Sequence, residues 1–195
     1  MKLKKVLCLS VALSTMSVMA ATSYAEQQLK VFASVGSASH EFGDGNYAFD
    51  DSATSYGLGG LLRFNQNFAA EFRYDNLGEI EQLFADNTGS HTDGLSLEGY
   101  SVGVLGGIPV GDTASIYAKV GVMFWDAEAQ YMNNTLYASD EDNSFYFGFG
   151  GEFMVSNEMS VAIEYTMMEA DVTFGGNREQ AYTVNNIALT LGYSF

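Results

Sequence analysis

The charged residues in the apolar segments of this 195-residue chain are few, and their spacing allows ion pairing. About one acidic or basic residue falls in each segment, among Gly, Ser and Ala, opposite large apolar side chains at alternate positions. Six charged residues share this polar face: Arg63, Glu71, Arg73, Lys119, Glu152 and Glu164. A poorly hydrated interior penalises an unpaired charge by several kcal/mol. The pattern therefore predicts an internal network of ion pairs.

The elements that position these charges are predicted from hydrophobic alternation. Side chains two positions apart in a strand point to the same face. Eight segments follow this period, although the facing of the first is not settled: residues 29–38, 55–64, 68–75, 100–108, 116–124, 145–155, 161–167 and 183–195. The last segment places Ile187, Leu189, Leu191, Tyr193 and Phe195 on one face. A strand wetted by lipid on one side and by a lumen on the other has this pattern.

The connections alternate between short and long. Short turns are expected at residues 65–67, 109–113 and 156–158, and long polar loops at 40–54, 77–94, 128–143 and 172–182. This asymmetry is typical of outer-membrane barrels, with both termini periplasmic and the long loops extracellular. We therefore predict an all-β, eight-stranded antiparallel transmembrane up-and-down β-barrel. A soluble β-sandwich or lipocalin-like barrel is the alternative, but its outer face would carry more charge.

The amino-terminal segment predicts export. Three lysines precede an apolar stretch at residues 6–19, and Ser23-Tyr24-Ala25 fits a signal peptidase site. Cleavage after Ala25 would leave a single barrel domain, residues 26–195. It would also remove Cys8, so no disulfide is expected. The formal net charge of −16 disfavours nucleic acid as a partner.

Several segments resemble OmpA-like outer-membrane barrels. The sequences EFRYDNLG (71–78), IYAKVGVMFWDA (116–127), GGEF (150–153), IEY (163–165) and LGYSF (191–195) resemble the third, fifth, sixth, seventh and last strands of that family. The resemblance implies insertion by the barrel-assembly machinery, with Gly192, Tyr193 and Phe195 as its assembly signal. Two departures accompany it. The chain ends at Phe195 without the peptidoglycan-binding domain of many members, so no wall-anchoring role is expected. Small residues such as Ala162 replace basic lumen residues of well-known members.

Catalytic and metal chemistry have weaker support in the sequence. Deacylation of lipid A would want a Ser nucleophile with a His base, yet only His40 and His91 exist, both expected as solvated loop side chains. Carboxylates such as Glu141 and Asp142 cluster in the predicted loops without the spacing of a calcium loop. No enzyme, cofactor or metal site is predicted, and whether the loops bind divalent cations stays open.

The functional prediction is a structural, surface-presenting outer-membrane barrel. The interior of an eight-stranded barrel is only just wide enough for side chains to fill it, which favours an ion-paired plug. The alternatives are a narrow, low-conductance porin-like channel and an adhesin or receptor acting through the loops. Expected partners are outer-membrane lipid and lipopolysaccharide, the assembly machinery, and a host, phage or cell-surface ligand, with the chain a monomer. Aromatic girdles are expected from Tyr56, Phe64, Tyr74, Tyr100 and Phe124, and Trp125 is expected to cap the lumen.

Overall fold

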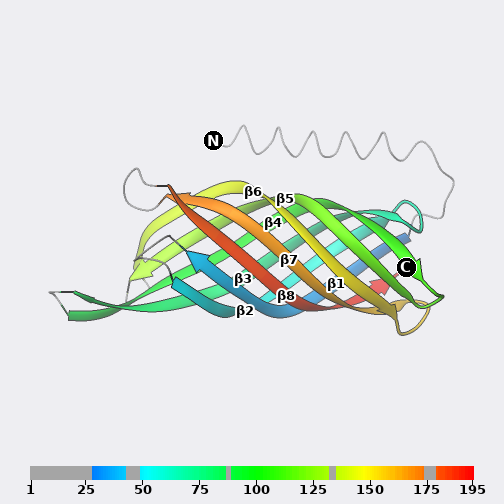
Figure 1. The fold of residues 1–195 in the computed structure, drawn as a ribbon, viewed down its shortest axis with the longest axis horizontal. Helices are drawn as coiled ribbons and strands as arrows, with labels where there is room; N and C mark the ends of the chain where they lie inside the picture. Colours follow the sequence, from blue (N-terminus) through cyan, green and yellow to red (C-terminus); the bar gives the residue numbers. More distant parts are fainter. Residues whose placement is uncertain (1–27, 43–48, 87–88, 132–134, 174–178) are drawn as a thin grey trace.

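The computed structural model describes residues 28–42, 49–86, 89–131, 135–173 and 179–195, and these form eight antiparallel strands. The strands pair in sequence order, and β1 also pairs with β8, which closes the barrel (Figure 1). Their bounds are β1 Gln28–Phe42, β2 Phe49–Arg63, β3 Phe68–Asp86, β4 Gly89–Val110, β5 Ala114–Tyr131, β6 Thr135–Met154, β7 Met159–Thr173 and β8 Glu179–Ser194. The predicted fold class is confirmed. The predicted signal peptide and its cleavage site lie outside the described residues.

The outer surface of the barrel is apolar, and the charged side chains of the strands within this apolar band are buried in the interior, which reverses the pattern of a soluble domain. On β1, Leu29, Val31 and Val35 are exposed, whereas Lys30 and Ser34 between them are buried. Every strand carries such outward residues, and the exposed fractions of large ones reach 64% for Ile163 and 78% for Phe145. Lipid, not water, is the solvent that this arrangement fits.

The two ends of the barrel are built differently. One end, called here the turn end, holds the short turns after β2, β4 and β6 and both ends of the described chain, where the Phe195 amide donates to the Leu29 carbonyl. The other end, called the hairpin end, carries strands that continue past the apolar band. The β3–β4 hairpin projects furthest there (Figure 1).

Three of the predicted long loops are largely strand, so this part of the prediction is wrong. Ladder pairs between β3 and β4 continue to Asp86↔Gly89, and those between β5 and β6 continue to Tyr131↔Thr135. These extensions lie above the apolar band, so their outer face does not need large apolar residues. Because these segments lack apolar alternation, their polar sequence resembles that of a loop.

The ladders differ in length around the barrel. The β2–β3 ladder stops at Tyr56↔Asn76 and the β6–β7 ladder at Tyr146↔Met168, whereas their neighbours continue toward the hairpin end. A bulge between Asn76 and Glu79 interrupts the pairing of β3, and Gly78 within it adopts φ of +88°. Gly78 tolerates this left-handed conformation because it has no Cβ. Beyond the two short ladders, the described residues of the hairpin end therefore form two four-stranded sheets, β3–β6 and β7–β8–β1–β2.

Inward glycines leave room for large lumen side chains. A Cβ on Gly121 would lie 2.6 Å from Cε1 of Tyr146, and one on Gly192 would lie 2.8 Å from Oγ of Ser160 and collide with the Lys30 side chain. The polar face of the strands is therefore rich in glycine for a steric reason. Among the described residues, no helix is long and apolar enough to span a bilayer.

Candidate functional site: the barrel lumen

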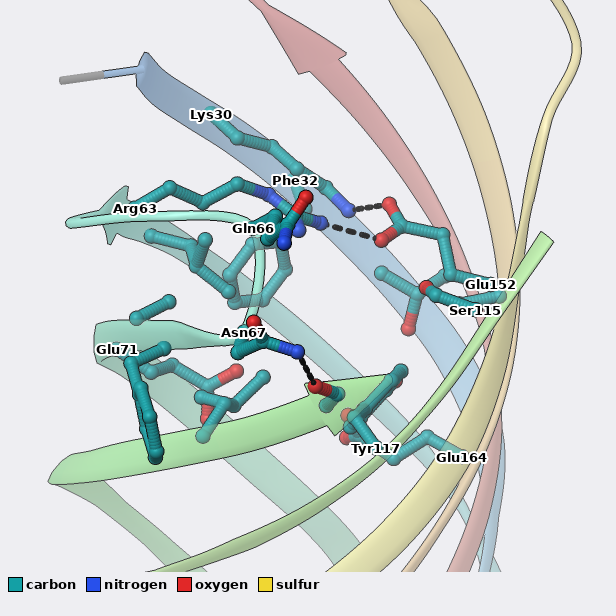
Figure 2. Close-up of a pocket in the computed structure, with 17 residues that line it drawn as sticks. Lys30, Phe32, Arg63, Gln66, Asn67, Glu71, Ser115, Tyr117, Glu152 and Glu164 are labelled. Atoms are coloured by element: carbon teal, nitrogen blue, oxygen red, sulfur yellow. Dashed lines mark hydrogen bonds and ion pairs between the residues drawn. The ribbon is translucent and has the colours of Figure 1, made fainter. Parts of the chain in front are cut away.

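A group of three charged side chains closes the lumen near the turn end. Glu152 of β6 accepts from Lys30 of β1 and, at 2.6 Å, from Nη2 of Arg63 of β2 (Figure 2). Lys30 and Glu152 are buried, while the Arg63 side chain keeps 28% of its exposure. Closure of the barrel brings the three together from distant parts of the chain.

A second, larger charged layer crosses the middle of the lumen. Nζ of Lys119 lies 3.1 Å from Oε1 of Glu71 and 2.8 Å from Oε1 of Glu164. The Arg73 guanidinium reaches the same Glu164 oxygen at 2.6 Å through Nη1 and binds Asp75 through Nε and Nη2 at 3.0 and 2.7 Å. This layer, the central ion-pair layer, joins β3, β5 and β7 across the barrel.

Neutral groups complete the central ion-pair layer. The Tyr117 hydroxyl donates to Glu164 at 3.1 Å, and the Tyr146 hydroxyl lies 3.5 Å from Glu71. Both cations also face aromatic rings: Lys119 lies 5.6 Å from the centroid of Tyr146, and Arg73 lies 5.5 Å from that of Phe32. These contacts replace part of the hydration that the buried charges lose.

The charges of the lumen balance. Across the two groups, Lys30, Arg63, Arg73 and Lys119 oppose Glu71, Asp75, Glu152 and Glu164, four of each sign. With zero net charge, these two groups carry no overall excess of one sign that would favour ions of the other. The arrangement suits mutual neutralisation more than ion selection.

Two small cavities lie on opposite sides of the central ion-pair layer. The cavity nearer the turn end, about 50 Å³, is lined by Glu71 and Glu164, and the other, about 30 Å³, by Arg73 and Lys119. These four side chains are joined directly by ion pairs. The layer therefore separates two spaces, each of them large enough only for a few water molecules.

An apolar cap fills the lumen between the central ion-pair layer and the hairpin end. Its buried members come from β1 and β3 to β8: Ala38, Leu77, Leu97, Met123, Trp125, Ala127, Tyr146, Met168, Ala170, Tyr182 and Val184. Trp125 is 2% exposed, and its Nε1 donates to Oγ of Ser144 at 2.9 Å. Trp125 thus points inward as predicted. The cap adds a second barrier above the charged layer.

His40 lies in this cap, and its predicted solvent exposure is wrong. It belongs to β1, its exposed fraction is 0%, and its ring stacks on Tyr182 at 5.8 Å. Nε2 lies 2.9 Å from the Leu77 carbonyl, which can only accept, so Nε2 carries a proton and Nδ1 accepts from the Tyr182 hydroxyl in the neutral ring. The β3 bulge frees the Leu77 carbonyl for this contact.

The pKa of His40 is lowered, chiefly because burial disfavours the charged ring. The Leu77 hydrogen bond and the charge of Asp51 oppose that effect only in part. His40 lies beyond the apolar band, since the outward residues that follow Val35 on β1 are Ser37, Ser39 and Glu41. The ring is therefore a neutral packing element of the cap.

The structure places the predicted charged residues in two groups. Glu71, Arg73, Lys119 and Glu164 lie in the central layer, and Arg63 with Glu152 lies near the turn end. Sequence reasoning missed Lys30 because the facing of the first segment was unsettled, although its place between Leu29 and Val31 was a usable signal. It also left out the partners Asp75, Tyr117, Tyr146 and Ser34, the last of which accepts from Arg73 at 3.2 Å.

Of the remaining predicted residues, Gly192 faces the lumen, and the predicted girdle residues lie on the outer surface or beside it. Tyr56 and Tyr100 are 53% and 56% exposed, and Phe64, Tyr74 and Phe124 are half-buried. The rings of Tyr193 and Phe195 meet edge to face at 5.0 Å. His91 belongs to β4, but its side chain lies outside the described part. Among the described residues, no group of three or more His, Cys, Asp and Glu is placed to hold a metal ion.

A closed antiparallel barrel with an apolar outer band and a charge-paired lumen defines a transmembrane β-barrel. Residues 8–195 match the family model of the outer membrane protein beta-barrel domain, and the chain belongs to that family. The predicted family is thereby confirmed, and membership places the protein among bacterial outer-membrane barrels. No curated protein sequence matches the chain.

Solved structures share the fold at low sequence identity. Neisserial surface protein A (NspA) is 10% identical with a TM-score of 0.67, over 86% of this chain and 97% of that one. Ail, the attachment invasion locus protein of Yersinia pestis, in complex with the heparin analogue sucrose octasulfate, is 15% identical at 0.55, over 88% and 100%. OprG from Pseudomonas aeruginosa is 12% identical at 0.51, over 87% and 96%.

Proposed function

We propose that this protein is a closed, non-enzymatic outer-membrane barrel whose plugged lumen supports a long, acidic, surface-presented hairpin end. The observation that carries this proposal is the filling of the lumen by two successive barriers. The central ion-pair layer joins three strands across the barrel, and the apolar cap lies above it. A pore would need a continuous wet path, and both barriers stand in its way.

The asymmetry of the barrel supports one orientation in the membrane. Short turns and both ends of the described chain lie together, and outer-membrane barrels place such ends in the periplasm. The hairpin end would then face the outside. Membership of the family and the asymmetry support this orientation, with lipid and lipopolysaccharide around the apolar band.

The negative charge of the hairpin end limits the classes of ligand that it would bind. Outward carboxylates stand above the apolar band on several strands: Glu41, Glu79, Glu98, Asp126, Glu128, Glu141 and Glu169. The heparin analogue in the Ail complex is a polyanion, which such a surface repels. We therefore propose that the ligands of this chain, if it acts as an adhesin, are neutral or cationic.

Catalysis is disfavoured by the state of His40. Both of its ring nitrogens are engaged, one by Tyr182 and one by the Leu77 carbonyl, and the ring has no exposed surface. A general base must reach the proton that it removes. His40 has no such access, which supports a structural role.

Cysteine labelling in whole cells tests the proposed orientation and presentation. The predicted mature chain has no cysteine, so Ser139→Cys at the hairpin end and Asp112→Cys in a turn each introduce one thiol. Both positions are exposed. A membrane-impermeant maleimide should label Ser139→Cys in intact cells and Asp112→Cys only after lysis. The reverse pattern would refute the orientation, and heat-dependent gel mobility checks that both variants fold.

A further inference from the structure

A hollow in the outer surface of the barrel lies over β4 and β5, in the part of the apolar band nearer the turn end. Its floor is formed by two small outward residues, Gly106 and Ala118, which pair in register. Larger apolar side chains surround this floor: Phe68, Val104, Ile108, Ile116, Val120 and Phe149. The hollow has a volume of about 720 Å³ and a mainly apolar lining. It is called here the outer hollow.

Two aromatic rings form opposite walls of the outer hollow. The Phe68 ring lies beside the floor, with Cε1 at 3.7 Å from the position that a Cβ of Gly106 would occupy. The Phe149 ring packs on Tyr165, with 5.2 Å between the centroids. The Tyr165 hydroxyl donates to Asn185 at 2.6 Å, which fixes this second wall. The outer hollow therefore results from small residues between large ones, and the packing of the walls maintains its shape.

The depth of the outer hollow corresponds to the hydrocarbon of one leaflet. Its floor lies four residues from Val110 and Ala114, the last pair before the β4–β5 turn. At about 3.3 Å per residue and a strand tilt of about 40°, this separation spans about 10 Å of depth, within the roughly 15 Å of one leaflet's hydrocarbon. Empty space beside apolar side chains loses dispersion contacts. An acyl chain of the leaflet at the turn end can therefore fill the hollow, with its headgroup near the turn.

The charges of the turn end favour one kind of headgroup. Asp112 lies exposed in the β4–β5 turn, directly beyond the outer hollow. The lysines and arginines of the described residues all belong to the lumen groups: Lys30, Arg63, Arg73 and Lys119. An anionic headgroup beside this turn would therefore meet a carboxylate of its own sign. A headgroup with a primary ammonium can instead donate a charge-assisted hydrogen bond to Asp112.

We propose that the outer hollow binds an acyl chain of a zwitterionic phospholipid with a primary ammonium headgroup, such as phosphatidylethanolamine, and that this ammonium pairs with Asp112. The apolar hollow supplies most of the affinity, and Asp112 supplies the preference over an anionic phospholipid. The source of the lipid, the periplasmic leaflet, rests on the proposed orientation of the barrel, whereas the binding itself does not.

Native mass spectrometry of the full barrel tests the proposal, with phosphatidylethanolamine and phosphatidylglycerol of identical acyl chains added in equal amounts to the detergent micelles. Gly106→Leu fills the floor of the outer hollow, and Gly60→Leu adds the same side chain to an outward glycine of β2. Both sites have room, since the nearest atoms to a new Cβ are Phe68 Cε1 at 3.7 Å and the Lys30 carbonyl oxygen at 3.8 Å. We expect Gly106→Leu to weaken phosphatidylethanolamine binding about ten-fold and Gly60→Leu to leave it within about two-fold.

Two further variants test the headgroup contact. Asp112→Asn removes the carboxylate of the β4–β5 turn, and Glu158→Gln removes an exposed carboxylate from the turn between β6 and β7. The unmodified barrel should bind phosphatidylethanolamine about three-fold more tightly than phosphatidylglycerol. Asp112→Asn should abolish this preference, and Glu158→Gln should retain it. Gel mobility after heating establishes that all four variants are folded.

Three outcomes would overturn the proposal. Equal lipid binding by Gly106→Leu and Gly60→Leu would mean that the outer hollow is not the binding site. A headgroup preference that is absent, or that survives in Asp112→Asn, would mean that Asp112 does not select the lipid. Dimers that Gly106→Leu abolishes would make the hollow an interface between two copies of the chain. These measurements use purified protein, so they are independent of the labelling experiment that tests orientation.

Discussion

The two halves of the lumen are filled by different chemistry. Toward the turn end and at the centre, four basic and four acidic side chains pair across the barrel. Toward the hairpin end, the apolar cap packs Leu97, Trp125 and Tyr182 with exposed fractions of 1–2%. The charged half lies within the lipid-facing band, whereas the cap lies level with and beyond its upper boundary.

The lumen is therefore blocked at two levels, by ion pairs at one and by apolar packing at the other. Ion pairs are directional, so they specify which strands face one another, as when Lys119 of β5 binds both Glu71 of β3 and Glu164 of β7. Apolar packing is less directional and gains free energy from burial alone. Substitutions should therefore have different signatures in the two halves.

The largest effect is expected from Lys119→Met. Glu71 has Lys119 as its one ion-pair partner among the described contacts, so the variant leaves a buried carboxylate without a direct ion pair. Removing one member of a buried pair costs about 3–5 kcal/mol. Urea unfolding in lipid vesicles should show this loss, and adding Glu71→Gln should recover part of it. No recovery in the double variant would contradict the pairing.

A loss of about 2–5 kcal/mol is expected from Leu97→Ala in the apolar cap. Leu97 is 1% exposed and belongs to the packed cluster, so the variant opens a cavity. The same unfolding measurement applies. The loss of stability in Leu97→Ala should be independent of the charge state of Glu71, whereas the loss in Lys119→Met should depend on it. A cost below about 1 kcal/mol would mean that the cap is loosely packed.

A smaller loss of stability is expected from Arg63→Ala, which removes a more exposed charge than Lys119→Met does. Arg63 shares Glu152 with Lys30 and keeps 28% of its side-chain exposure, so the remaining ion pair still neutralises Glu152. Its removal should cost about 1 kcal/mol or less. If Arg63→Ala matched Lys119→Met, burial would not be what distinguishes these pairs.

The smallest effect is a pH dependence that belongs to His40. Its folded pKa is below the ordinary value, so the unfolded chain binds more protons between the two values. The contribution of His40 to stability is complete above about pH 6.5 and declines as the pH falls toward the folded pKa, by at most about 1.4 kcal/mol per pH unit. Unfolding measured from pH 7 to 5.5 should show this slope, and His40→Gln should flatten it.

Much of the barrel was predictable because lipid imposes a strict period on the strands that it contacts. Residues such as Tyr100, Val104 and Ile108 showed this alternation, and they are all exposed. Above the band, lipid no longer imposes apolar residues on the outer face, so the strand extensions of β4 and β6 carried no such signal. Composition alone could not separate them from loops.

The sequence predicted which types of residue face the lumen, but it predicted only part of which charged side chains pair with one another. Alternation pointed Glu152 and Arg63 inward, yet which strands meet depends on the closure of the barrel. Lys30 and Glu152, 122 positions apart, meet through that closure. His40 was missed for a different reason: the Leu77 carbonyl that holds it is freed by a bulge, which the sequence pattern does not reveal.

Planar-bilayer conductance of the refolded, purified barrel tests the central claim most directly, with Lys119→Ala measured in parallel. A lumen closed by the central ion-pair layer and the apolar cap predicts a silent bilayer from demonstrably folded protein. Discrete conductance steps whose size shifts in Lys119→Ala would contradict the account and establish a charge-lined pore.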